Sequence, residues 1–245
     1  MNATANYQLT IIVPVYNEQE GLPALEARLG AYLPLCPVKA CVLLVNDGST
    51  DGSAARILEA CSRQPDFYYI GFDRNRGLST VLKAGFDLAE SDLCGYLDAD
   101  LQTAPEDFDL LLAALGDNDL VTGIRVGRKD TAWKRFQSRF ANAWRRMFTH
   151  DGAIDTGCPL KVIRTAMARK LPMFRGMHRF LPALVLLEGG RYAQVNVRHF
   201  PRTAGKSKYH LWNRLWGPLA DCFAYRWMKS RHISYLVSQT NLDQS

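Results

Sequence analysis

The chain has 245 residues, of which 47% are hydrophobic and 22% charged, a composition typical of a folded globular protein with a substantial core. The formal net charge of +6 conceals an uneven distribution. Residues 1–124 carry 7 basic and 18 acidic side chains, whereas residues 125–245 carry 23 and 6. This asymmetry predicts that the first half meets a cation or a neutral ligand, and that the second half meets polyanions or an anionic surface.

Several classes of protein are disfavoured at once. The six cysteines form no CxxC pair and no grouping with histidine, so the sequence predicts neither a zinc site nor a disulfide framework. Residues 1–10 lack the charged region and the apolar core of a secretory signal. The longest purely apolar run, at 181–187, is far shorter than the roughly 20 residues of a membrane-spanning helix. We therefore expect a reducing compartment and, at most, peripheral contact with a membrane.

Short β-branched runs alternate with amphipathic stretches over the first 124 residues. Strands are predicted at 9–15, 40–45, 67–72, 93–97 and near 120–123, and helices at 18–33, 51–62, 78–89 and after Pro105. This alternation is typical of a single doubly wound, mostly parallel α/β sheet of Rossmann-like type, with helices on both faces. After residue 124 the sequence changes to basic, aromatic-bearing helices. We expect one domain over 1–210, followed by a C-terminal amphipathic helix and polar tail over 211–245.

Polar clusters follow the predicted strands at the point where each strand ends. They read YNE, NDGSTDGS, DRNRG and DADLQ, and they follow the first four strands in that order. Ligands of doubly wound sheets bind beyond the carboxyl ends of the strands, so these four clusters are expected to meet at one crevice.

Two of the clusters contain carboxylates with a chemical interpretation. Asp47 can accept a hydrogen bond from a nucleobase N–H, although the same segment also suits a turn followed by a helix N-cap. Asp98 and Asp100 place two hard oxygen donors after an apolar strand, which suits Mg²⁺ or Mn²⁺ bound to a diphosphate, and Gln102 can add a carbonyl oxygen. A DxD pair also occurs often in solvated turns.

The ordered set of motifs resembles a known family. IVPVYNEQEGL, VNDGSTDGS, NRGLSTVLKAGFDLA, YLDADLQTAPED, TGIR and GRKD are similar to the inverting family-two glycosyltransferases of type-A fold. The resemblance spans about residues 7–231 and is strongest to dolichyl-phosphate mannose synthases and bacterial undecaprenyl-phosphate sugar transferases. It implies transfer of a sugar from a UDP- or GDP-linked donor to a polyprenyl phosphate.

The resemblance also implies roles for individual residues. Pro14, Tyr16, Glu18, Asp47 and Asp98 would bind the nucleotide-sugar donor. The metal, Mg²⁺ or Mn²⁺, would be held by Asp98, Asp100 and Gln102.

The lipid-phosphate branch is indicated by DLQ, IDTGCPLKVIR, HRFLPAL and HFPRTAGKSKY. By resemblance, the phosphates would be bound by Arg125, Arg128, Arg202, Lys206, Ser207 and Lys208. Arg offers bidentate contacts to a phosphate, and Lys a point charge. The catalytic set would comprise Asp100, Asp155 and Arg128, with Asp155 either a base or a group that orients the acceptor. His178 is interpreted as a packed or capping residue.

Two segments have the pattern of interfacial helices. Aromatic residues recur at helical spacing beside basic ones, with Trp133, Phe136, Phe140, Trp144 and Phe148 interleaved with Lys134, Arg135, Arg139, Arg145 and Arg146. The second segment has Trp212, Leu215, Trp216, Leu219, Phe223 and Trp227, flanked by Lys208, Arg214, Arg226, Lys229 and Arg231. Such faces suit the headgroup zone of an anionic leaflet, although core packing explains most aromatic stripes.

The expected location is therefore the cytoplasmic face of the inner membrane, with peripheral attachment that a membrane partner protein or a homo-oligomer can support. Two alternatives stay open. The same fold can glycosylate a polysaccharide or another non-lipid acceptor. A nucleic-acid-binding protein would use the basic second half, but it would leave the DAD and NDGST motifs unexplained, so no nucleic-acid partner is expected. The sequence does not distinguish the sugar, the nucleotide base, Mg²⁺ from Mn²⁺, or the oligomeric state.

Overall fold

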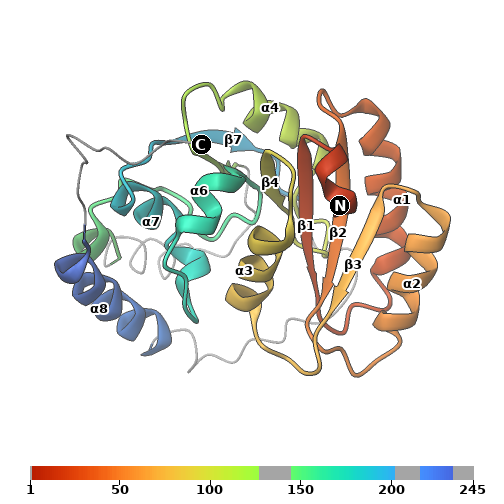
Figure 1. The fold of residues 1–245 in the computed structure, drawn as a ribbon, viewed down its shortest axis with the longest axis horizontal. Coiled ribbons are helices and arrows are strands. Elements are labelled where there is room, and N and C mark those ends of the chain that lie inside the picture. Colours follow the sequence, from red (N-terminus) through yellow and green to blue (C-terminus); the bar gives the residue numbers. More distant parts are fainter. Residues whose placement is uncertain (1, 127–144, 202–215, 234–245) are drawn as a thin grey trace, which may run out of the picture.

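The computed structural model describes residues 2–126, 145–201 and 216–233 (Figure 1). Within these ranges one seven-stranded sheet has the order β3-β2-β1-β4-β6-β5-β7. Its strands are β1 (Leu9–Val15), β2 (Ala40–Asn46), β3 (Phe67–Gly71), β4 (Leu93–Tyr96), β5 (Leu120–Arg125), β6 (Lys161–Arg164) and β7 (Tyr192–Val197). Only β6 runs antiparallel to its neighbours, β4 and β5. The predicted mostly parallel sheet is confirmed.

Helices cover both faces of the sheet. They are α1 (Leu22–Tyr32), α2 (Ser53–Arg63), α3 (Leu78–Leu88), α4 (Phe108–Ala113), α6 (Thr165–Lys170) and α7 (Leu181–Leu187). Successive side chains of a strand point to opposite faces, so Ile11 belongs to the core with α1, α2 and α4, whereas Ile12 packs with α3, α6 and α7. Both isoleucines are fully buried. The two apolar layers make the sheet the rigid support for the loops at its edge.

The first helix begins later than the sequence predicts. The apolar pattern favours a helix over 18–33, but α1 starts at Leu22. Asn17 has a positive φ of 53°, and the Glu18 carbonyl accepts hydrogen bonds from Gly21 N (3.0 Å) and Leu22 N (3.1 Å). A left-handed residue cannot continue a helix, so residues 16–21 form a loop at the carboxyl end of β1.

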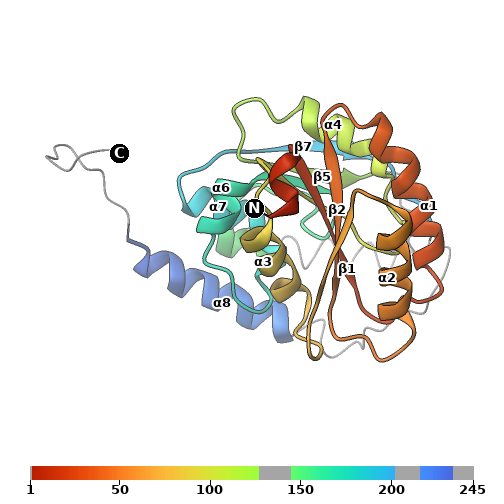
Figure 2. The ribbon, with the colours of Figure 1, turned by 45° about the vertical axis from the view of Figure 1, so that its right-hand side comes forward.

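A further helix, α8 (Trp216–Arg231), lies at the opposite end of the molecule from α1 and α2 (Figures 1 and 2). Its buried residues Cys222 and Tyr225 join the core beside α7, and the Tyr225 ring stacks on Phe180 at 5.8 Å between centroids. No helix in the described ranges is long and apolar enough to cross a membrane. The predicted boundary at residue 210 lies outside the described residues and stays a prediction.

Candidate functional site

The loops that follow β1 and β2 are tied together at the carboxyl edge of the sheet. Thr50 N donates to Asn17 Oδ1 (2.7 Å), and Gly52 N donates to Gln19 Oε1 (2.8 Å). In the other direction, Glu18 N donates to Ser53 Oγ (2.9 Å). These contacts bring the YNE and NDGSTDGS motifs together, as the sequence predicts. Pro14, Tyr16 and Glu18 lie there partly buried.

Asp47 anchors the loop that follows β3. Its carboxylate is 5% exposed and accepts hydrogen bonds from Arg76 N (2.6 Å) and Gly77 N (3.0 Å). Beside it Gly48 has a φ of +65°, and a Cβ there would lie 2.2 Å from the carbonyl carbon of Arg74. Glycine is therefore required where the two loops touch. The nucleobase contact of Asp47 stays a prediction, since the carboxylate already holds this loop.

The DAD motif follows β4 directly. Tyr96 Oη donates to Asp98 Oδ1 (2.6 Å), and Gln102 N donates to Asp100 Oδ1 (3.1 Å). Burial and the neighbouring charge of Asp100 raise the pKa of Asp98 to about 6. Leu101 has a positive φ of 53°, an uncommon conformation for a leucine that turns the chain sharply after the two carboxylates.

A divalent cation fits this pair of carboxylates chemically. Two acidic oxygens held close together repel each other, and a cation removes that repulsion. Among the described residues, no group of three or more His, Cys, Asp or Glu side chains is arranged to hold a metal. The residues that could hold such an ion are Asp98 and Asp100, with the amide oxygen of Gln102 as a further donor.

The loop after β7 packs against the DAD loop. The carbonyl of Gln102 accepts hydrogen bonds from Phe200 N (2.8 Å) and His199 Nδ1 (3.1 Å). Next to it, the buried Asp107 carboxylate pairs with the Arg198 guanidinium at 2.7 Å. The described segment that ends at residue 201 therefore lies beside the DAD motif. The predicted phosphate-binding residues that follow, Arg202, Lys206, Ser207 and Lys208, lie outside the described residues, as does Arg128.

Arg125 and Asp155 form a bidentate ion pair. Arg125 ends β5, and its Nε and Nη2 atoms donate to Asp155 Oδ2 and Oδ1, both at 2.8 Å. The backbone N–H of Arg125 adds a third bond to Oδ2 at 3.2 Å. Burial lowers the pKa of the guanidinium, but its hydrogen bonds to Asp155 outweigh that effect, and the pKa is raised overall. Two residues predicted in separate roles thus form one ion pair.

Lys161 is a buried cation that no sequence motif indicates. It is 2% exposed and pairs across the sheet with Tyr96, over whose ring its ammonium lies at 5.4 Å. The ammonium also donates to the carbonyl of Cys158. Burial lowers the pKa of Lys161, while Asp155 and Asp98 oppose that effect. Its only sequence signal is a lysine inside the apolar run PLKVI, which an amphipathic surface strand also explains.

His178 has the packed environment that the sequence predicts. Its Nδ1 lies 2.8 Å from Ser79 Oγ, and burial, with the nearby charges of Arg179 and Lys161, lowers its pKa to about 3. The ring is therefore neutral at physiological pH.

The prediction that the first aromatic and basic segment is an interfacial helix is wrong in part. Arg145, expected beside lipid headgroups, is 6% exposed and forms a buried ion pair with Asp151. Phe148 packs edge-on against Phe223 of α8, with 5.1 Å between ring centroids. A basic residue within an aromatic stripe can thus be buried when a carboxylate lies close enough in the fold to form an ion pair with it. Residues 133–144 lie outside the described residues.

Comparisons with known proteins agree with this arrangement. The sequence profile of glycosyl transferase family 2 matches residues 10–172. The undecaprenyl-phosphate 4-deoxy-4-formamido-L-arabinose transferases of Yersinia enterocolitica and Yersinia pestis are similar to the chain, at 33% and 34% identity over 207 residues. Each match covers 83% of this chain and 63% of the relative, so the chain spans less than two thirds of the length of these curated relatives.

Solved structures share the fold. The structure of glucosyl-3-phosphoglycerate synthase from Mycobacterium tuberculosis, in complex with Mn²⁺, UDP-glucose and phosphoglyceric acid, matches with a TM-score of 0.68 and 14% identity. It covers 95% of this chain and 82% of the other. A complex of the same enzyme with Mg²⁺ and UDP gives a TM-score of 0.66. These matches confirm the predicted type-A architecture.

Proposed function

Because the chain belongs to glycosyl transferase family 2, we propose that it transfers a sugar from a UDP- or GDP-linked donor to a polyprenyl phosphate, with inversion at the anomeric carbon. The observation that carries this proposal is that two acidic side chains and a paired arginine lie at the same edge of the sheet. Asp98 and Asp100 follow β4, and Arg125, which is paired with Asp155, ends β5 two strands away. The first suits a donor diphosphate and the second an anionic acceptor. The names of the Yersinia relatives support the acceptor class.

On the donor side, the residues of the edge hold the nucleotide sugar in place. The interlocked loops after β1 and β2 form one wall, where Tyr16, Glu18 and Asp47 would bind the nucleotide. A bound Mg²⁺ or Mn²⁺ would supply positive charge to the diphosphate as it leaves. Tyr96 fixes one oxygen of Asp98 by its 2.6 Å bond, so that the carboxylate faces the donor in a defined orientation.

On the acceptor side, little proton transfer is required. A phosphate monoester has a second pKa of about 6 and is already mostly ionised near neutral pH, so it can attack the anomeric carbon directly. Asp155 then serves to orient Arg125, whose guanidinium binds and aligns the phosphate. The basic residues Arg128, Arg202, Lys206 and Lys208, with Ser207, would complete the phosphate site.

We also propose that α8 lies on the membrane that carries the acceptor. Phe223 and Trp227 are 59% and 68% exposed, and Arg226, Lys229 and Arg231 are exposed on the same helix. Exposed aromatic side chains beside basic ones suit the headgroup zone of an anionic leaflet. The implied location is peripheral, on the cytoplasmic face of the inner membrane.

The decisive experiment measures transfer from radiolabelled UDP- and GDP-sugars to a short-chain polyprenyl phosphate, with Mg²⁺, Mn²⁺ or EDTA. We expect one labelled polyprenyl-phosphate sugar, formed only with metal, whose anomeric configuration by NMR is opposite to that of the donor. The matched controls are the polyprenyl alcohol, which lacks the phosphate, and the Asp98→Asn and Asp100→Asn variants. Transfer to an oligosaccharide but not to the lipid phosphate would replace this acceptor with a polysaccharide.

A further inference from the structure

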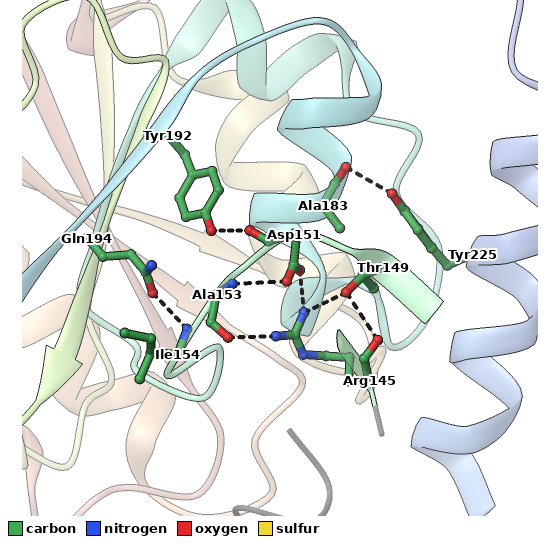
Figure 3. Close-up of polar contacts among 9 residues, drawn as sticks. All are labelled: Arg145, Thr149, Asp151, Ala153, Ile154, Ala183, Tyr192, Gln194 and Tyr225. Atoms are coloured by element: carbon green, nitrogen blue, oxygen red, sulfur yellow. Dashed lines mark hydrogen bonds and ion pairs between the residues drawn. The ribbon is translucent and has the colours of Figure 1, made fainter. Parts of the chain in front are cut away.

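A buried polar network underlies the segment that leads to Asp155 (Figure 3). Residues 145–149 are helical, and Arg145 points from this turn into the interior. Its Nη1 donates to Asp151 Oδ2 and to Thr149 Oγ1 (3.3 Å), and its Nη2 donates to the carbonyl of Ala153 (3.0 Å). Arg145 and Asp151 are 6% and 4% exposed, so the ion pair is shielded from water.

The same segment is bonded from a second side by β7. Tyr192 Oη donates to the carbonyl of Asp151, and Ile154 N donates to Gln194 Oε1 (2.8 Å). Asp151 closes the turn on itself, because its Oδ1 accepts from Ala153 N (3.0 Å). Residues 151–154 are therefore fixed by a helix on one side and a strand on the other, immediately before the Arg125–Asp155 pair.

Stability alone does not account for the network. A buried ion pair gains little over well-packed apolar side chains of similar size, since both charges must leave water. The Nε atom of Arg145 is also buried and has no hydrogen-bond partner among the described residues, which adds a further cost. What an arginine fork supplies and an apolar side chain does not is direction: it sets the places of one carboxylate and one carbonyl at once.

We propose that Arg145 and Asp151 are positioning residues for Asp155. They hold the backbone of 151–154 so that the Asp155 carboxylate meets the Arg125 guanidinium in bidentate geometry, with the guanidinium turned toward the acceptor phosphate. This inference rests on the proposed transfer to a lipid phosphate. It assigns the network to the acceptor half of the reaction, and it predicts no effect on donor binding.

Two variants loosen the network without removing a buried side chain. Arg145→Lys keeps the charge but replaces the planar fork with a single ammonium, which cannot serve Asp151 and Ala153 in the same geometry. Tyr192→Phe removes only the hydroxyl that bonds Asp151, and it keeps the protein testable if the lysine variant fails to fold. The matched control is Tyr7→Phe, which removes the 2.6 Å bond from Tyr7 Oη to Asp66, outside the network.

The measurements are kcat and KM for a short-chain polyprenyl phosphate, the Kd of the donor nucleotide by calorimetry, and hydrogen–deuterium exchange of residues 150–158. For both network variants we expect kcat/KM for the acceptor to fall by about 10-fold or more, because a small displacement of a positioned group can lower rates by up to about 10²-fold. The donor Kd should stay at the wild-type value. The amides of Ala153 and Ile154 should exchange faster, and Tyr7→Phe should change none of these quantities.

Three other results would contradict the inference, and a fourth would refute the proposed function instead. Faster exchange with unchanged acceptor kinetics would make the network a purely structural anchor and overturn the inference. Unchanged exchange in a folded variant would show that the pair does not order the segment, which also overturns it. Equal losses of donor affinity and acceptor kinetics would contradict its assignment to the acceptor half. Absence of transfer by the wild-type enzyme would instead refute the proposed function. The wild-type assay comes first, so this result is distinguished from a failure of the inference.

Discussion

Arg125 and Asp155 are 30 positions apart in the chain, yet three hydrogen bonds join them, two from the guanidinium and one from the backbone N–H of Arg125. The carboxylate is thereby committed to the arginine. This geometry favours a role for Asp155 in orienting a cation over a role as general base, because the proposed phosphate acceptor would need no base near neutral pH.

The first prediction distinguishes these two roles by substitution. Asp155→Asn keeps the shape and one carbonyl oxygen but removes the charge that holds Arg125, and truncating one partner of such a pair costs about 2–5 kcal/mol in interactions that depend on it. We expect kcat/KM for polyprenyl phosphate to fall by at least about 30-fold at pH 8, with the pH profile unchanged in shape. Steady-state kinetics between pH 6 and 9 provide the measurement. Disappearance in the variant of an acidic limb that the wild-type profile shows would instead identify Asp155 as a base.

A second prediction concerns Asp98 and pH in the absence of metal. Its pKa in the folded protein, about 6, lies above the ordinary value of about 3.9. The folded state therefore binds this proton more tightly than the unfolded state, so the contribution of Asp98 to stability is present below about pH 4 and is lost as pH rises through 6. With EDTA, Asp98→Asn should be more stable than wild type at pH 7.5 by about 1–3 kcal/mol. The Asn side chain can still accept the bond from Tyr96.

Chemical denaturation at pH 5.0 and 7.5, with EDTA or with Mn²⁺, measures this effect. The advantage of the Asn variant should shrink at pH 5.0, and it should reverse with Mn²⁺, because only the wild-type carboxylate gains from the cation. An identical ranking of the two proteins in all four conditions would contradict both the repulsion and the metal assignment.

The third prediction tests the contact between the loops after β2 and β3. Gly48→Ala would place a Cβ at 2.2 Å from the Arg74 carbonyl carbon and would force alanine to a φ of +65°. Gly116→Ala is the matched control, since Gly116 also has a positive φ, of +39°, but no atom lies within 4 Å of the added Cβ. Conformational strain alone costs about 1–2 kcal/mol, so Gly116→Ala should lose about that much.

Gly48→Ala should lose about 2 kcal/mol more, because backbone rather than a flexible side chain blocks the new methyl group. It should also weaken nucleotide binding, since the displaced loop carries Asp47. Thermal unfolding and calorimetric titration with UDP and GDP give the two readouts. Equal destabilisation by the two substitutions would mean that the loops separate without cost.

The strands were predictable because each is an apolar run bounded by polar turn residues. The run at 9–15 coincides with β1, and the runs at 40–45 and 93–97 differ from β2 and β4 by one residue at the end. The insertion of β6 between β4 and β5 was not predictable, because β6 is only four residues long and pairs antiparallel with strands distant in sequence. Local periodicity carries no information about such pairing.

In the candidate site, too, motifs identify single residues but not the contacts between distant segments. Asp98 and Asp100 were found because a motif places both in one loop. The contacts of Arg125 with Asp155, and of Arg145 with Asp151, depend on how segments fold back on each other, so the sequence indicates the residues but not the pairs. Lys161 was missed because a single charge in a short strand is more often exposed, whereas here it is buried with its ammonium over the ring of Tyr96.

The fourth prediction concerns α8 as a membrane surface. Phe223 and Trp227 are largely exposed, so replacing both with Ser should leave Cys222 and Tyr225 buried and should remove the edge contact of Phe223 with Phe148. We expect Phe223→Ser/Trp227→Ser to lose most of its binding to vesicles that contain anionic phospholipid, because insertion of aromatic side chains and attraction of basic ones act together at such surfaces. Vesicle flotation provides the measurement. The control is Leu58→Ser, on α2 at the other end of the molecule. The Leu58 side chain is exposed too, at 49%.

The double variant also separates docking from chemistry. Its kcat/KM should be normal for a short-chain acceptor dispersed in detergent, and it should be reduced for the same acceptor in vesicles, because only the second substrate has to be reached at a membrane. Raising the salt concentration should weaken wild-type binding, since exposed charges are screened over about 8 Å at physiological ionic strength. Undiminished flotation of the double variant would assign membrane contact to another part of the chain, and equal losses with both substrates would place α8 in support of the active site instead.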